Sequence, residues 1–126
     1  KNKIMGLNST EVAFGFGQMG SAYLADTNAY TPPTGKVIVS IQILDDATKF
    51  ALLTPDTSGY LDGTTGAAKK GATAYIGTTT PVAQNGANAD AINTATTFKA
   101  GINIVGRFTA VTLGAGSVIM YLADVR

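Results

Sequence analysis

The residues that most often carry enzyme chemistry are absent from this sequence or stand without a suitable partner. The chain contains no histidine and no cysteine, which removes the commonest general base, the thiolate nucleophile and the commonest transition-metal ligands. Serine, threonine, lysine and aspartate remain as nucleophiles, but nothing in their spacing brings such a pair together. We therefore expect a protein that is not an enzyme, with no catalytic residues and no cofactor.

One glycine pattern has the spacing of a dinucleotide-binding loop. Gly15, Gly17 and Gly20 form a GxGxxG sequence, which binds a pyrophosphate only when it joins a strand to the N-terminus of a helix. Pro32 and Pro33 would stop such a helix early. A glycine-rich chain produces this pattern by chance, so we do not expect a nucleotide site.

Two groups of oxygen-bearing side chains have the chemistry of a calcium site. Asp45 and Asp46 are adjacent, and Asn85, Asn88 and Asp90 form a second group. A hard cation needs six or more converging oxygens, and neither group has the spacing of a calcium loop. Asp and Asn are also common turn residues. We expect turns at both places and no metal.

Alternating apolar residues predict β-strands as the elements that position any functional side chain. Residues 36–44 give the clearest strand, in which Val37, Val39, Ile41 and Ile43 form one apolar face. Residues 10–18 alternate in the same way, and residues 49–54 resume after turn formers at 45–48. We expect 36–44 and 49–54 to pair as a hairpin.

The C-terminal region predicts a second hairpin, on which the interpretation of the whole chain depends. The runs 107–113 and 117–123 are separated by Gly114, Ala115 and Gly116, the length and chemistry of a three-residue hairpin loop. The second run is apolar on both faces, with Val118, Met120 and Leu122 on one side and Ile119, Tyr121 and Ala123 on the other. A ribbon of this kind needs a cover on each face, which can be a second sheet, a loop or another copy of the chain.

The remaining segments complete the expected organisation of one domain over residues 1–126. Residues 1–9 are expected to form an N-terminal arm with Ile4, Met5 and Leu7 as its apolar points. Residues 21–30 favour a short strand or one helical turn, and 55–97 form a long excursion rich in Gly, Thr and Ala. Within it we expect a short strand at 73–76 and either a helix or a loop at 87–94. The fold class is all-β, an antiparallel β-sandwich or barrel-like fold built from hairpins, with little helix.

Charge and hydropathy limit the partners. Only 13% of the residues are charged and the net charge is +1, so the chain lacks the basic footprint of a nucleic-acid or anionic-lipid binder. No apolar run approaches the roughly 18 residues that span a bilayer, and we expect no membrane contact. A neutral surface is easily desolvated, which favours packing against copies of the chain or a protein partner.

Two stretches resemble capsid decoration (cement) proteins of tailed bacteriophages, a group of small virion structural proteins. They are PPTGKVIVSIQILDDATKF at 32–50 and GRFTAVTLGAGSVIMYLAD at 106–124, with a fainter likeness in FGFGQMGSAYL at 14–24. The resemblance implies a β-rich homotrimer or homodimer on the capsid exterior that binds the major capsid protein and stabilises the head. The expected interface residues are Ile4, Met5, Leu7, Ile119, Met120 and Tyr121.

The sequence leaves two other functions open. The chain can serve elsewhere in a virion, as a head fibre or a tail-associated subunit. It can also be a fimbrial or adhesin-like module that binds glycans through loop side chains, for which Tyr60, Tyr75 and Asn85 are candidates because aromatic rings and amides bind sugars.

Overall fold

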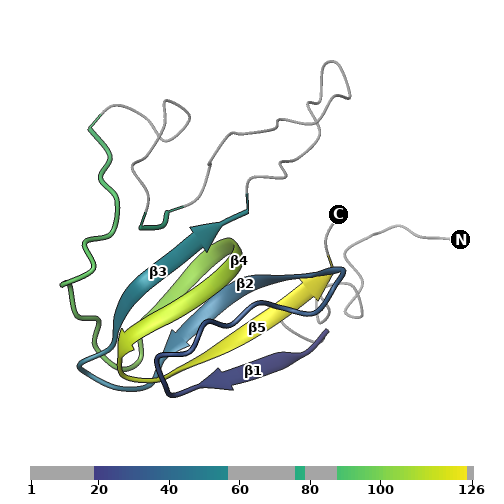
Figure 1. The fold of residues 1–126 in the computed structure, drawn as a ribbon, viewed down its shortest axis with the longest axis horizontal. Helices are drawn as coiled ribbons and strands as arrows, with labels where there is room; N and C mark the ends of the chain where they lie inside the picture. Colours follow the sequence, from purple (N-terminus) through teal and green to yellow (C-terminus); the bar gives the residue numbers. More distant parts are fainter. Residues whose placement is uncertain (1–18, 57–75, 79–87, 125–126) are drawn as a thin grey trace, which may run out of the picture.

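The fold is a single antiparallel sheet, seen here in a computed structural model that describes residues 19–56, 76–78 and 88–124. These residues form five strands and no helix (Figure 1). The strands are β1 (Ser21–Leu24), β2 (Lys36–Ile43), β3 (Lys49–Pro55), β4 (Asn103–Ala115) and β5 (Val118–Asp124). They lie in the order β1-β5-β2-β4-β3. The expected all-β antiparallel fold is confirmed, whereas the arm at 1–9, the strand at 10–18 and most of the 55–97 excursion lie outside the described residues.

The two predicted hairpins are wrong. Strand β4 lies between β2 and β3, and β2 lies between β4 and β5, so neither pair of successive strands is hydrogen-bonded. The short links β2–β3 and β4–β5, which the sequence predicts to be hairpin loops, each join two strands that have another strand between them in the sheet. Strand β5, apolar on both faces, consequently has a neighbour on each side, β1 and β2, and is an interior strand of the sheet.

Strand β4 curls the sheet, because its two halves pair with different neighbours. Its first half pairs with β2 as far as Phe108, and its second half pairs with β3 from Phe108 to Ala115. Figure 1 shows the β4 ribbon turning back on itself between these halves. The turn brings all strands around one hydrophobic core, which contains Leu24, Ile38, Ile41, Ile43, Phe50, Leu53, Ile104, Phe108, Val111, Leu113, Val118, Met120 and Leu122.

A β-bulge in β2 corrects the predicted apolar face of that strand. Ile38 pairs with Leu122 and Ser40 pairs with Tyr121, which leaves Val39 as an extra residue between two consecutive pairs. An extra residue reverses the alternation of side chains between the two faces. The core therefore contains Ile38, Ile41 and Ile43 of this strand, and Val39 lies outside it.

Hydrogen bonds around Thr48 join the loops at one end of the sheet. The buried Thr48 hydroxyl donates to the Asp45 carbonyl at 2.8 Å and accepts from the Ser117 backbone N–H at 3.3 Å. The Phe98 N–H donates to the Thr48 carbonyl at 2.7 Å. These bonds connect the β2–β3 link, the β4–β5 link and the segment before β4, so all three hold one another in place.

The segment before β4 is irregular where the structure describes it. The sequence leaves a helix or a loop open at 87–94, and residues 88–94 contain turns and irregular chain but no helix. The Ile92 N–H donates to the Gly77 carbonyl at 2.8 Å, and the Thr78 N–H donates to the Leu53 carbonyl at 3.0 Å. These bonds attach the segment to β3. Over the described ranges no helix is long and apolar enough to cross a membrane.

Tyr30 makes the stability of the fold sensitive to alkaline pH. This residue precedes β2, exchanges two backbone hydrogen bonds with Val111 and packs partly against the core. Burial disfavours the charged phenolate and raises the pKa of Tyr30 above its ordinary value of 10.0. Below that value the phenol is neutral in both states. As the pH rises above it, the unfolded chain loses the proton first, so the free energy of unfolding falls.

We expect the Tyr30→Phe variant to lose less stability than the parent protein between pH 8 and pH 11. Urea unfolding at pH 8 and pH 11 gives the loss of unfolding free energy for each protein. Comparing the loss in the variant with the loss in the parent removes the contribution of the other tyrosines and the lysines. An equal loss in both proteins would contradict the assigned role of Tyr30.

Candidate functional site

The candidate site lies on the side of β1, β5, β2 and the first half of β4 that faces away from the core. Side chains alternate across a strand, so the neighbours of the core residues point to this side. We call it the outer face. It comprises Ser21, Tyr23, Ser40, Gln42, Asn103, Val105, Ile119 and Tyr121. Beyond these eight residues Val37 and Ala123 lie on the same side by register, and Val37 is fully buried although it is not part of the core cluster.

The strand pairing arranges the outer face in two rows that run across the strands. Tyr23 pairs with Ile119, Ile119 with Gln42, and Gln42 with Asn103. The second row in the same strand order is Ser21, Tyr121, Ser40 and Val105. Tyr23 and Val105 are the most exposed large apolar side chains described, at 68% and 74%. They stand at opposite ends of the two rows.

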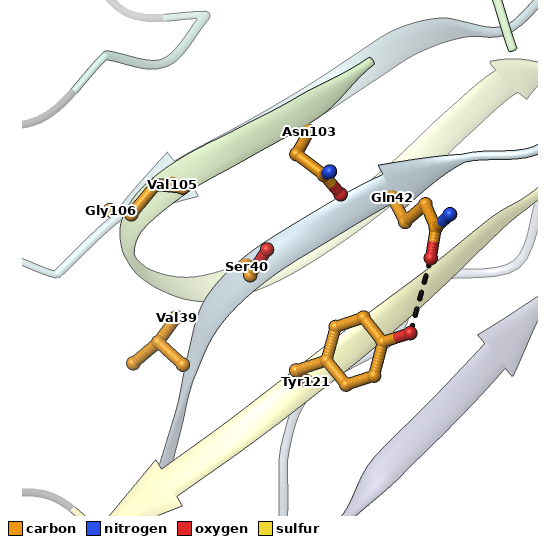
Figure 2. A pocket seen from close by; sticks show the side chains of 7 residues that line it. All are labelled: Val39, Ser40, Gln42, Asn103, Val105, Gly106 and Tyr121. Carbon is orange, nitrogen blue, oxygen red and sulfur yellow. Dashed lines mark hydrogen bonds between the residues drawn. The ribbon is translucent and has the colours of Figure 1, made fainter. Parts of the chain in front are cut away.

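A hollow of about 450 Å³ lies in this face, lined by Val39, Ser40, Gln42, Asn103, Val105, Gly106 and Tyr121 (Figure 2). Two local features of β2 and β4 produce this hollow. The bulge in β2 places Val39 beside Ser40, and Gly106, which has no side chain, lies opposite where β4 turns. The volume falls in the range of about 300 to 1,000 Å³ that is common for ligand sites.

Tyr121 and Gln42 fix each other within the hollow. The Tyr121 hydroxyl donates to Gln42 Oε1 at 3.1 Å, the bond drawn in Figure 2. The amide nitrogen of Gln42 points away from the ring, and the Asn103 side chain lies on the other side of Gln42 (Figure 2). The hollow thus offers amide and hydroxyl groups around one aromatic ring, held on strands.

None of the described residues that line the hollow is charged. Lys36 Nζ and Asp124 Oδ1 form an ion pair of 2.8 Å where β2 and β5 end. The Arg107 guanidinium donates to Asp56 Oδ2 at 3.0 Å, and that carboxylate is buried. The second pair fastens the end of β3 to the turn of β4, because the Asp56 N–H also donates to the Arg107 carbonyl. The outer face itself contains no charged residue.

The predicted interface residues fall into three groups. Ile119 and Tyr121 lie on the outer face and are partly buried. Met120, between them, points to the opposite side and is fully buried in the core. Ile4, Met5 and Leu7 lie outside the described residues, as do the glycan candidates Tyr60, Tyr75 and Asn85.

The structure also locates the remaining motifs. Gly20 lies just before β1, and its carbonyl accepts a hydrogen bond from the Leu122 N–H of β5. A strand therefore follows Gly20, where a dinucleotide loop needs a helix. Asp45 Oδ1 accepts from the Ala47 N–H, and Asp46 Oδ1 accepts from the Ala100 N–H. The Asp45 bond is a turn contact, whereas the Asp46 bond joins the β2–β3 link to the segment before β4. In the described part of the chain no three acidic residues gather as a metal site would need.

Sequence reasoning missed Tyr23, Gln42 and Asn103 as members of one surface. Nothing in the local sequence brings residues 23 and 103 to the same row, because they belong to strands at opposite ends of this row. The sequence does contain one signal that could have identified this surface: uncharged side chains recur at alternate positions of several strands.

The outer face can bind an uncharged partner through apolar area and neutral hydrogen-bonding groups. Two of its exposed members, Tyr23 and Val105, are aromatic or aliphatic, as contact surfaces often have. Comparison of the chain with protein-family models, with curated proteins and with solved structures gives no match.

Proposed function

We propose that this chain is a non-enzymatic structural protein of a bacteriophage virion, which decorates the capsid exterior and stabilises it by binding major capsid protein subunits. The observation that carries the proposal is the uncharged outer face, with Tyr23 and Val105 exposed on it. Exposed aromatic and aliphatic side chains on an uncharged sheet face support this proposal, because a protein partner can cover them without burying charge.

The proposal joins this surface with the family resemblance of residues 32–50 and 106–124. In this view copies of the chain associate through the outer face, where Ile119 and Tyr121 lie, and the N-terminal arm contacts the capsid lattice. Several linked copies bind a lattice more tightly than one, because each later contact is intramolecular. A low overall charge suits both contacts, since neutral surfaces are desolvated at little cost.

The test uses capsids of the source phage assembled without this chain. Purified protein is added, unbound chain is removed by gradient sedimentation, and the bound copies are counted against the major capsid protein. We expect saturable, stoichiometric binding and a higher temperature of capsid disruption. The Ile119→Asp variant should bind less at a given concentration, whereas Leu52→Asp, which places the same charge at an exposed position on β3, should bind like the parent.

Absence of binding at saturating protein would contradict the proposal. So would binding that leaves the disruption temperature unchanged, because a decoration protein must stabilise what it covers.

A further inference from the structure

The hollow on the outer face combines one aromatic ring with several neutral hydrogen-bonding groups. We infer that it is a binding site for a short neutral saccharide, in which the Tyr121 ring packs against a sugar ring and the amides of Gln42 and Asn103 bind its hydroxyl groups. The inference goes beyond the proposed function and does not depend on it, because it concerns the isolated chain. A ligand of this size needs only the hollow and not the whole outer face.

Tyr121 supplies the apolar surface that a sugar ring needs. One face of a pyranose ring consists of C–H groups, and such groups pack favourably on the electron-rich face of an aromatic ring. Figure 2 shows the Tyr121 ring from its flat face, and its hydroxyl is held by the 3.1 Å bond to Gln42 Oε1. Val39 and Val105 add apolar area to the lining. The ring is thus in position before a ligand arrives, which lowers the entropic cost of binding.

The amides of Gln42 and Asn103 have hydrogen-bonding capacity to offer a ligand. In the described part of the chain, Tyr121 is the one hydrogen-bond partner of the Gln42 side chain, and the Asn103 side chain has none. The Gln42 amide nitrogen therefore keeps its N–H donors, while the Asn103 amide and the Ser40 hydroxyl can donate and accept. Sugar hydroxyls also donate and accept, so they match a set of neutral groups of both kinds.

The uncharged lining decides the class of ligand. A uronic acid, a sulfated sugar or a phosphate ester would find no lysine or arginine in the hollow to replace the water around its charge. A purely apolar ligand would cover the amides of Gln42 and Asn103 and leave them without partners, which is also unfavourable. A neutral ligand with many hydroxyl groups avoids both costs.

The affinity of a single chain should be low. Asn103 and Val105 are exposed, so water competes with the ligand at the edge of the hollow. We expect a dissociation constant on the order of 1 mM for a trisaccharide, because few groups contribute and the ligand loses its freedom of motion. An assembly with many copies of the chain would bind a saccharide-coated surface much more tightly, since each later contact is intramolecular.

Backbone-amide NMR of the isolated chain tests the site. The probes are three neutral trisaccharides, maltotriose, cellotriose and triacetylchitotriose, each added to about 20 mM, well above the expected dissociation constant. At least one should cause saturable shifts that centre on the amides of Ser40, Gln42, Asn103 and Tyr121. Trigalacturonic acid, which carries a carboxylate on each sugar, should bind about tenfold more weakly or worse, because nothing in the hollow compensates its charge.

Matched variants test the ring and the amide separately. Tyr121→Ala should weaken binding of the same trisaccharide about tenfold, whereas Tyr23→Ala, which removes an exposed tyrosine from the outer face but not from the hollow, should bind like the parent. Asn103→Ala should weaken binding about fivefold through the lost hydrogen bonds. Asn103 is exposed, so its replacement should leave the free energy of unfolding unchanged and keeps the test decisive even if Tyr121→Ala does not fold.

The inference would be overturned by the absence of saturable shifts with all three neutral trisaccharides, by shifts centred outside the hollow, by unchanged binding of Asn103→Ala, or by equally tight binding of trigalacturonic acid. Failure of the proposed function is separate from these results. A chain that binds a trisaccharide but not capsids refutes the virion role, and one that binds capsids but no trisaccharide refutes only the saccharide site.

Discussion

Gly116→Ala is expected to destabilise the protein by about 3 kcal/mol or more, through strain at a positive φ and overpacking of a closed site. Gly116 lies in the link between β4 and β5 with φ +89°, a conformation that residues with a side chain rarely adopt. A Cβ there would overlap the Thr48 hydroxyl and lie 2.5 Å from the Thr48 Cα. The backbone cannot yield easily, because Thr48 is fully buried and hydrogen-bonded to Asp45, Ser117 and Phe98.

Gly35→Ala is the matched control for this substitution. Gly35 has nearly the same backbone angle, φ +86°, but no atom lies within 4 Å of the position of its Cβ. Its replacement should therefore cost only the conformational strain, about 1 to 2 kcal/mol. Urea unfolding at pH 7 gives both free energies, and their difference measures the contact with Thr48. Equal destabilisation of the two variants would contradict this expectation, because it would mean that the loops around Thr48 move aside to accommodate the added Cβ.

The sequence located most strands but not their neighbours. The alternation in 36–44 and 117–123 is local, and both segments are strands close to their predicted bounds. Pairing is a different problem, because the links at 44–48 and 116–117 contain ordinary turn residues that fit a hairpin equally well. What decides the order is the curl of β4, whose halves pair with β2 and β3. No short stretch of sequence contains that information.

The hollow was beyond prediction for a related reason. It depends on a bulge at Val39, on the missing side chain of Gly106 and on the ring of Tyr121, which belong to three different strands. The sequence places Val39 in an unbroken apolar alternation, and only the pairing with β5 shows the extra residue. The candidate residue Tyr121 was found from its own strand, whereas its hydrogen-bond partner Gln42 was not.

Aspartate substitutions at Met120 and Ile119 are expected to have very different effects on stability. These neighbouring residues of β5 point to opposite sides of the sheet. Met120 is fully buried among the core residues. Met120→Asp places a carboxylate there without a charged partner, which costs several kcal/mol and is expected to unfold the protein at pH 7. Met120→Leu nearly conserves volume and should cost less than about 1.5 kcal/mol. Circular dichroism and urea unfolding distinguish these results.

Ile119→Asp tests the other side of the same strand. Its side chain is partly exposed on the outer face, so the carboxylate keeps water contact and the fold should persist with a loss of about 1 kcal/mol. The new charge would lie in an otherwise uncharged surface, and binding to capsids should fall as proposed above. If Met120→Asp folded with the parent's stability, or if Ile119→Asp unfolded the chain, the assignment of the two faces would be wrong. One side of β5 holds the core, and the other faces a partner in the proposed function, so this pair of substitutions separates folding from association within a single strand.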